Sequence, residues 1–327
     1  MVNKLLEVKG LKTYFHTFKG TVKAVDGISF SLNRGEILGI VGESGGGKSV
    51  AGFSIMKLIE EPGFIQAGEI IFQGEDINRK NEREMKDIRG KDIAMIFQDP
   101  MTSLNPLYTI YQQLEEVLKL HSKMGAKARR ERCIELLNQV GIPQPADRLN
   151  SYPHQFSGGM RQRVIIAIAL AAKPKLIIAD EPTTALDVTI QAQILQLLKR
   201  LVQENNSSLI LITHDLAVVS QMVDKIIVMY CGKILEQGKI DDIIYQPAHP
   251  YTSGLLNSIP RLRDQKKRLE QIPGIVPNMF QLPAGCNFAP RCRCFRDKCL
   301  VDQPEIATIE KEHGVACHFP LLEVGRI

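Results

Sequence analysis

The stretch that decides the fold is "ILGIVGESGGGKSV", residues 37–50. Gly42 and Gly47 bracket four residues, and Lys48 and Ser49 follow, which matches the P-loop pattern G-x-x-x-x-G-K-[ST]. A strand-like apolar run precedes the pattern and a helix-like run follows it, which is the context that the motif requires. Glycines let a backbone fold so tightly that its N–H groups point at phosphate oxygens. The stretch therefore predicts a nucleoside-triphosphate site.

Each part of this loop has an expected role. The N-terminus of the following helix adds partial positive charge. We expect Lys48 to reach the β- and γ-phosphates and the Ser49 hydroxyl to ligate Mg²⁺. The expected nucleotide-binding residues of the loop are Gly42, Glu43, Ser44, Gly45, Gly46, Gly47, Lys48, Ser49 and Val50.

A second candidate lies in "KLIIADEPTTALD", residues 175–187, where an apolar run ends in two adjacent carboxylates. Asp180 is expected to hold the Mg²⁺ shell. Glu181 is then placed to polarise an attacking water. Such a pair alone is more often a solvated turn, but the upstream P-loop favours the catalytic interpretation.

Composition and length limit the possible number of domains, the class of partner and the cellular compartment. The chain has 327 residues, which suggests about two domains. The formal net charge of +5 permits an acidic partner but does not require nucleic acid. No run of 18 apolar residues occurs, and the N-terminus does not resemble a signal peptide. We therefore expect a cytosolic chain, in which clustered cysteines indicate metal binding or catalysis rather than disulfides.

The order of predicted elements indicates an α/β fold. Short strands are expected within residues 4–41, helices over 107–150, from 158 to Pro174 and over 188–204, and two strands around a Cys-Gly turn in 225–238. Buried, largely apolar strands, expected at 93–98, 175–180 and 207–214, alternate with these helices. This alternation favours a parallel sheet covered on both faces. After about residue 245 proline becomes frequent and regular periodicity fades, so we place a domain boundary there.

Between the two motifs lies "FSGGMRQR", residues 156–163, and here the sequence resembles the nucleotide-binding subunits of ABC transporters. Ser157, Gly158 and Gly159 match the signature of that family, with Met160 where the common form has glutamine. Further matches follow in family order. They are an aromatic at Phe15 (with Tyr14 as the alternative), the Q-loop at Gln98, the D-loop at Ala185, Leu186 and Asp187, and the switch histidine at His214.

The resemblance implies a P-loop ATPase core of ABC type. Its fold would be a mixed, largely parallel sheet with an antiparallel β subdomain and a helical subdomain at about 103–156, within an ATPase domain at 1–245. A small Pro/Cys-rich extension would follow at 246–327. Residues 99–110, "DPMTSLNPLYTI", would receive the membrane subunits.

The resemblance also implies roles for the matched residues. Glu181 would be the catalytic base, His214 would contact the γ-phosphate, and Gln98 would touch Mg²⁺ and the water. Phe15 would stack on adenine. Ser157, Gly158, Gly159 and Asp187 would face the nucleotide held by the opposite subunit, with ATP sandwiched between two subunits.

The tail narrows the resemblance. "HPYTSGLLNSIPRL", residues 249–262, and "GCNFAPRC", residues 285–292, resemble segments of dipeptide, oligopeptide and nickel importer subunits. This implies an ATPase that powers peptide import and lies peripherally on the cytoplasmic face of the cell membrane. The implied partners are two permease subunits, a second ATPase subunit (identical or different) and an extracytoplasmic substrate-binding protein, with no nucleic acid. Nickel import, a soluble ABC-type ATPase acting on nucleic acid or ribosomes, and a redox or metal sensor remain alternatives.

Five of the seven cysteines gather in the tail. Cys286, Cys292, Cys299 and Cys317 match a pattern that holds a [4Fe–4S] cluster in some importer subunits. Four thiolates are the usual requirement of such a cluster. Zinc remains the alternative, although the spacing lacks the paired C-x₂-C common in structural zinc sites. A set of reduced structural thiols is also open, and Cys294 departs from the family pattern.

Overall fold

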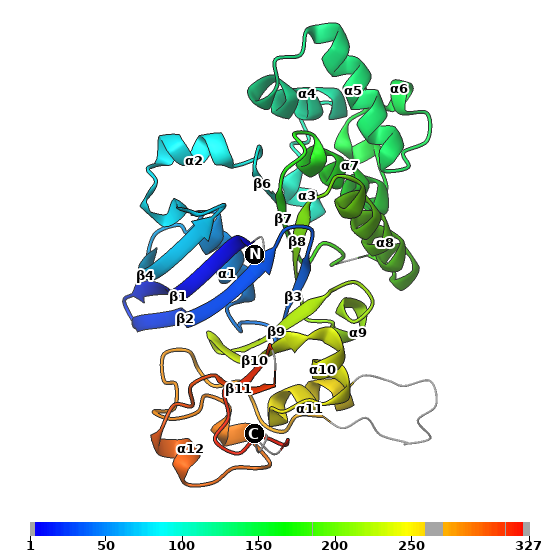
Figure 1. The fold of residues 1–327 in the computed structure, drawn as a ribbon. Helices are drawn as coiled ribbons and strands as arrows, with labels where there is room; N and C mark the ends of the chain where they lie inside the picture. Colours follow the sequence, from blue (N-terminus) through cyan, green and yellow to red (C-terminus); the bar gives the residue numbers. More distant parts are fainter. Residues whose placement is uncertain (1–3, 185, 259–270, 311, 323–327) are drawn as a thin grey trace. The chain divides into compact units, whose positions relative to one another are not determined.

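The computed structural model describes residues 4–184, 186–258, 271–310 and 312–322 (Figure 1). Contacts divide the chain into two compact units. The first comprises Asn33–Glu36 and Arg79–Leu211, and the second comprises Lys4–Leu32, Ile37–Asn78 and the described part of 212–327. Among the described residues, no helix is both long and apolar enough to cross a bilayer.

The first unit carries a group of packed helices. Helices α4, α5 and α7 contact one another in pairs, and Figure 1 draws them together in green. Capping explains where two of them begin, because the Thr109 hydroxyl starts α4 and the Ser157 hydroxyl starts α7. The helices are α2 (Glu82–Ile88), α3 (Pro100–Ser103), α4 (Ile110–His121), α5 (Ala126–Gln139), α6 (Pro145–Arg148), α7 (Gly158–Leu170) and α8 (Val188–Glu204).

Three buried strands accompany these helices in the order β8-β7-β6. They are β6 (Ile93–Ile96), β7 (Leu176–Asp180) and β8 (Ser208–Thr213), the last of which runs from the first unit into the second. Strands β6 and β7 pair in parallel. The predicted apolar strands and the helices at 107–150 and 188–204 are therefore confirmed.

The second unit contains a four-stranded sheet in the order β2-β1-β4-β5, in which β1 pairs antiparallel with β4 and β4 with β5. These strands are β1 (Lys4–Thr17), β2 (Gly20–Asn33), β4 (Gly63–Phe72) and β5 (Glu75–Asp76). Their pairing forms the expected antiparallel subdomain.

A second sheet region of this unit runs in the order β11-β12-β10-β9-β3. Its strands are β3 (Ile37–Val41), β9 (Lys225–Tyr230), β10 (Lys233–Lys239), β11 (Ala307–Glu310) and β12 (His313–Val315). Strand β3 pairs in parallel with β9, whereas the other neighbours pair antiparallel. The unit's helices are α1 (Lys48–Ile55), α9 (Leu216–Val219), α10 (Ile240–Tyr245), α11 (Pro250–Asn257) and α12 (Lys298–Val301). The tail thus contributes two strands that fading periodicity did not predict.

Candidate functional site

The P-loop follows a strand that is buried at every residue, β3. A Cβ atom at Gly42 would overlap the carbonyl oxygen of Met229, so the loop backbone approaches β9 as only glycine allows. Gly47 has φ +93° and forms the N-cap of α1. The chain therefore turns into the N-terminus of a helix, where backbone N–H groups favour an anion.

Lys48 lies inside this loop rather than in solvent. Its side chain is almost fully buried, at 5% exposure. Its Nζ donates hydrogen bonds to the carbonyl oxygens of Gly42, at 2.8 Å, and Glu43, at 2.9 Å. The loop therefore holds a buried cation at a helix N-terminus, which is suited to phosphate.

The other loop residues differ in exposure. Ser44 and Gly45 are exposed, Gly42, Gly46 and Gly47 are buried, and Glu43, Ser49 and Val50 are intermediate. The predicted phosphate-binding residues thus form one continuous turn with an accessible tip.

Both candidate aromatics lie on β1, and each is half-buried. The Tyr14 hydroxyl donates to Asp26 Oδ1 at 2.6 Å. Phe15 pairs with Gly63 across the sheet, and its ring occupies the space that a side chain at Gly63 would need. The Tyr14 hydroxyl is therefore fixed by a hydrogen bond, whereas the Phe15 ring packs over Gly63, which has no side chain to displace it.

His214 follows the last residue of β8 and is exposed. The next residue, Asp215, accepts a hydrogen bond from the Val218 backbone N–H at 3.2 Å, which stabilises the start of α9. The switch candidate therefore lies in a short ordered turn between a buried strand and a helix.

The first unit brings together two residues that are far apart in the sequence. Gln98 Nε2 donates to Glu181 Oε2 at 2.9 Å, and Thr184 Oγ1 donates to the same oxygen at 3.0 Å. Glu181 follows the buried strand β7 with φ +44°, and Asp180 is buried at the end of that strand. The Glu181 carboxylate is thus oriented by two polar side chains, an arrangement that suits a residue that positions water.

The signature residues lie at the start of α7. The Ser157 side chain accepts from the Met160 N–H at 3.4 Å, and a Cβ at Gly159 would lie 2.9 Å from Ile190 of α8. Ser157 and Gly158 are exposed, as is Asp187, the N-cap of α8. Ala185 of the predicted D-loop lies outside the described residues. The exposed helix start leaves donors available to an anion.

Five tail cysteines line one small cavity. Four of them are the predicted ligands, of which Cys299 lies on α12 and the others lie in non-helical segments of the tail. Backbone N–H groups hydrogen-bond three of the sulfurs, namely Cys286 from Phe288 and Ala289, Cys292 from Cys294, and Cys317 from Phe319. The structure thus brings the four predicted ligands together with Cys294, the cysteine that does not match the family pattern.

As free thiols, Cys286, Cys292 and Cys317 are neutral at ordinary pH, because burial raises the pKa of each. Burial raises the pKa of Cys292 to about 11 and that of Cys317 to about 12. Within the described part of the chain, no three His, Cys, Asp or Glu side chains are arranged to hold a metal ion. The gathering of thiols is therefore a finding, whereas the cluster remains a prediction.

Sequence reasoning missed three residues of the second unit that contact the P-loop or the cavity. Arg291 forms an ion pair with Glu43, and the Tyr251 hydroxyl accepts from the Glu43 N–H at 2.9 Å. His249 is buried, lines the cysteine cavity and accepts from the Tyr251 N–H at 3.0 Å. All three lie in the tail segments 249–262 and 285–292, which resemble importer subunits. That resemblance was the only feature of the sequence that pointed to these residues.

Comparisons with known proteins agree with this layout. Residues 25–184 match the ABC transporter family, and residues 235–299 match the family described as "Oligopeptide/dipeptide transporter, C-terminal region". The chain is 50% identical over 322 residues to the dipeptide transport ATP-binding protein DppD of Escherichia coli (strain K12), covering 98% of both chains. It is 55% identical over 316 residues to the oligopeptide transport ATP-binding protein OppD of Bacillus subtilis (strain 168), covering 96% of this chain and 88% of that one.

Solved structures share the fold. The ATP-binding cassette MJ0796, determined as a dimer in a post-hydrolysis state with ADP and phosphate, superposes with a TM-score of 0.65 and 30% sequence identity. That match covers 72% of this chain and 98% of the cassette. The predicted ABC-type P-loop fold is confirmed. The chain belongs to the ABC transporter ATPases, in their dipeptide and oligopeptide transporter branch.

Proposed function

We propose that this chain is the ATP-hydrolysing subunit of a membrane transporter that imports dipeptides or oligopeptides. The observation that most supports this proposal is the Glu181 carboxylate at the end of β7, which accepts hydrogen bonds from Gln98 and Thr184. The same chain also has a glycine-rich phosphate loop. Full-length similarity to dipeptide and oligopeptide transport ATP-binding proteins supports the cargo class.

In this proposal the P-loop and Lys48 bind the phosphates, Glu181 acts as the base and His214 contacts the γ-phosphate. Mg²⁺ would be held by Ser49, Asp180 and Gln98, and when bound it neutralises charge on the β- and γ-oxygens. The side-chain oxygens of Ser49, Asp180 and Gln98 are suitable ligands for this hard cation. Phe15 would stack on adenine. Ser157, Gly158, Gly159 and Asp187 would complete the site of a second ATPase subunit.

The test is Glu181→Gln in the purified full-length chain. We expect Mg-dependent ATP hydrolysis to fall by about 100-fold or more, because general-base catalysis contributes roughly 10²–10⁴-fold, while ATP still binds. Glu204→Gln is the matched control, since Glu204 is an exposed glutamate at the end of α8. Normal turnover in Glu181→Gln would contradict the assigned role.

We also propose that residues 99–110 receive a permease subunit. Met101, Leu107 and Tyr108 are 65%, 80% and 50% exposed, an unusual density of large apolar side chains on one short segment. The proposed transporter also contains two permease subunits and an extracytoplasmic substrate-binding protein, and this chain lies peripherally at the membrane.

Cargo choice needs a separate experiment. Pull-down from membranes, followed by ATPase assays of the assembled transporter, would compare a dipeptide, a longer peptide and Ni²⁺ with the substrate-binding protein present. Stimulation by peptide is expected. Stimulation by Ni²⁺ alone would mean that the cargo is nickel and not a peptide. Recovery of ribosomes or RNA in place of membrane proteins would mean that the chain is not a transporter subunit.

We further propose that Cys286, Cys292, Cys299 and Cys317 hold a [4Fe–4S] cluster. Support comes from the common cavity and from the backbone N–H groups directed at three of the sulfurs, which lower the thiol pKa values against the larger raising effect of burial. When bound, such a cluster supplies a covalent staple and a redox couple.

Anaerobic purification tests this part. Four irons and four sulfides per chain with brown absorption are expected, as a [4Fe–4S] cluster requires. Cys292→Ser should lose them and Cys294→Ser should keep them. Stoichiometric zinc without visible absorption would refute the cluster in favour of zinc.

A further inference from the structure

Glu43, the second residue of the P-loop, is fixed from the tail on two sides. Its carboxylate accepts from Arg291 twice, from Nη1 at 2.5 Å and from Nη2 at 3.0 Å. Its backbone N–H donates to the Tyr251 hydroxyl at 2.9 Å. Because its carbonyl also accepts from Lys48, the position of this one residue is linked to the buried cation of the loop.

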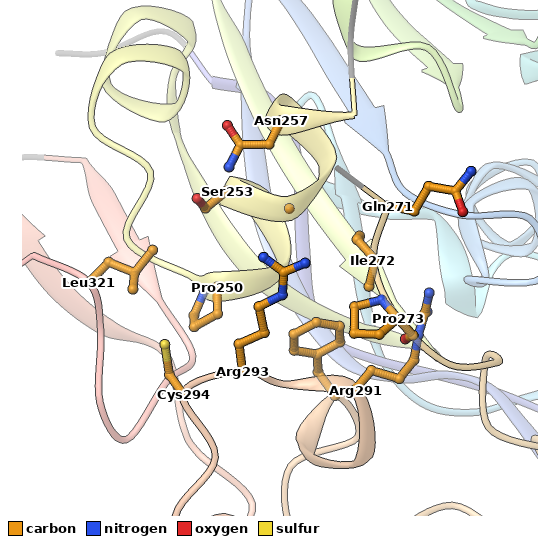
Figure 2. A pocket seen from close by; sticks show the side chains of 12 residues that line it. Pro250, Ser253, Asn257, Gln271, Ile272, Pro273, Arg291, Arg293, Cys294 and Leu321 are labelled. Atoms are coloured by element: carbon orange, nitrogen blue, oxygen red, sulfur yellow. The ribbon is translucent and has the colours of Figure 1, made fainter. Parts of the chain in front are cut away.

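Arg291 is itself held in place. Its side chain is only 5% exposed, its Nε donates to the Pro273 carbonyl at 2.9 Å, and its Nη1 also reaches the Tyr230 hydroxyl at 3.2 Å. Figure 2 shows the side chain extending past Pro273, away from that of Arg293. A guanidinium that is fixed in this way presents a rigid two-pronged donor to a carboxylate.

The backbone of Arg291 belongs to the turn that joins two of the cavity cysteines. The Ala289 N–H donates to the Cys286 carbonyl at 2.9 Å, and the Cys292 N–H donates to the Ala289 carbonyl at 3.2 Å. The Arg291 N–H bonds the Phe288 carbonyl within the same turn, at 3.0 Å. A shift of the backbone at either cysteine would therefore be passed to the residue that clamps Glu43.

We propose that Arg291 is a positioning residue of the nucleotide site that couples the cysteine-lined cavity to the P-loop. A P-loop binds phosphate only when its N–H groups are aimed correctly, so a clamp on Glu43 raises nucleotide affinity by pre-organising the loop. Coupling between two sites is reciprocal, so nucleotide binding in turn stabilises the cysteine turn. This inference rests on the proposed ATP site, and it does not depend on what the cavity holds.

The first experiment measures the dissociation constant for ATP by calorimetry on the full-length chain. Arg291→Met and Glu43→Gln should each weaken binding about tenfold, and the double variant should be no weaker than either single variant. Arg291→Lys should recover part of the affinity. Arg296→Met is the matched control, because that arginine stacks on Phe319 at 4.2 Å within the same tail.

The second experiment tests the coupling itself. Cys292→Ser should weaken ATP binding in the wild-type background and add nothing in the Arg291→Met background, whereas Cys294→Ser should have little effect in either. A cysteine change that merely destabilised the fold would weaken binding equally in both backgrounds.

Three results would overturn the coupling. They are unchanged ATP affinity in Arg291→Met, additive losses with Glu43→Gln, and equal effects of Cys292→Ser in both backgrounds. Should Arg291→Met fail to fold, Glu43→Gln with Cys292→Ser gives the same cycle from the loop side. A wild-type chain that does not bind ATP would instead overturn the proposed function.

Discussion

Gly47 shows how closely the phosphate loop is constrained at a single residue. It has φ +93°, and a Cβ there would overlap the carbonyl oxygen of Ala24. Gly45 also has positive φ, at +75°, but nothing lies within 4 Å of its missing Cβ. The two glycines thus separate the cost of backbone conformation from the cost of a steric clash.

We therefore expect Gly47→Ala to lower the free energy of unfolding by about 3 kcal/mol or more, and Gly45→Ala by about 1 kcal/mol. Urea unfolding of both purified variants checks this. Equal losses would mean that the strand carrying Ala24 moves aside without cost.

The two aromatic candidates on β1 give a second prediction. Phe15→Ala removes the ring that we propose stacks on adenine, whereas Tyr14→Phe removes only the hydroxyl bonded to Asp26. Base stacking contributes roughly 1–3 kcal/mol, so Phe15→Ala should weaken ATP binding about 5- to 150-fold and Tyr14→Phe less than twofold. Nucleotide titrations of the two variants decide this, and the reverse order would assign adenine to Tyr14.

Residues with local motifs could be predicted from sequence, and residues with only distant partners could not. Lys48 and Glu181 are found because glycine spacing and a strand-end carboxylate pair are visible within a few positions. Arg291 meets Glu43 from 248 positions away, and nothing near either residue signals the partner. Such pairs follow from tertiary packing alone.

Among helices and strands, those with a periodic pattern along their whole length could be predicted from the sequence, whereas short strands that depend on pairing could not. Strand β7 and helix α8 are clear in the sequence because each repeats its pattern over a full element. Strands β11 and β12 have four and three residues, so their pairing with each other and with β10 is what makes them strands. A short edge strand leaves too few positions for a pattern.

The segment at 99–110 supports an element-scale prediction. Leu107→Glu should abolish co-purification with permease subunits while leaving the thermal midpoint and basal ATPase of the isolated chain unchanged, because the side chain is exposed. Leu120→Glu, on the exposed side of α4, is the matched control. Retention of the permeases by Leu107→Glu would move the docking surface elsewhere.

At the scale of the whole molecule, the tail is built into the second unit rather than appended to it. The buried Glu236 carboxylate of β10 accepts from the N–H groups of Ala248 and His249, at 2.6 and 3.0 Å, and bonds His313 Nε2 at 2.8 Å. A buried carboxylate needs such partners, and here the tail supplies all three. The proposed boundary at 245/246 therefore separates segments that share hydrogen bonds.

This sharing leads to the last prediction, the removal of residues 246–327. The shortened chain loses β12 from the edge of β10, the partners of Glu236, and the side chains of Tyr251 and Phe288 that pack on Tyr230. Losing one large buried side chain costs about 3–5 kcal/mol, so we expect the thermal midpoint to fall by at least about 10 °C and ATP binding to weaken more than in Arg291→Met.

Calorimetry of residues 1–245 beside the full chain provides the measurement, with removal of 323–327 as the control for shortening as such. A soluble 1–245 chain with the full chain's midpoint and ATP affinity would show that the ATPase core is autonomous, and the clamp on Glu43 would then be dispensable. The expected outcome makes the tail a structural part of the nucleotide-binding unit, because tail residues form the hydrogen bonds described above to the carboxylates of Glu43 and Glu236.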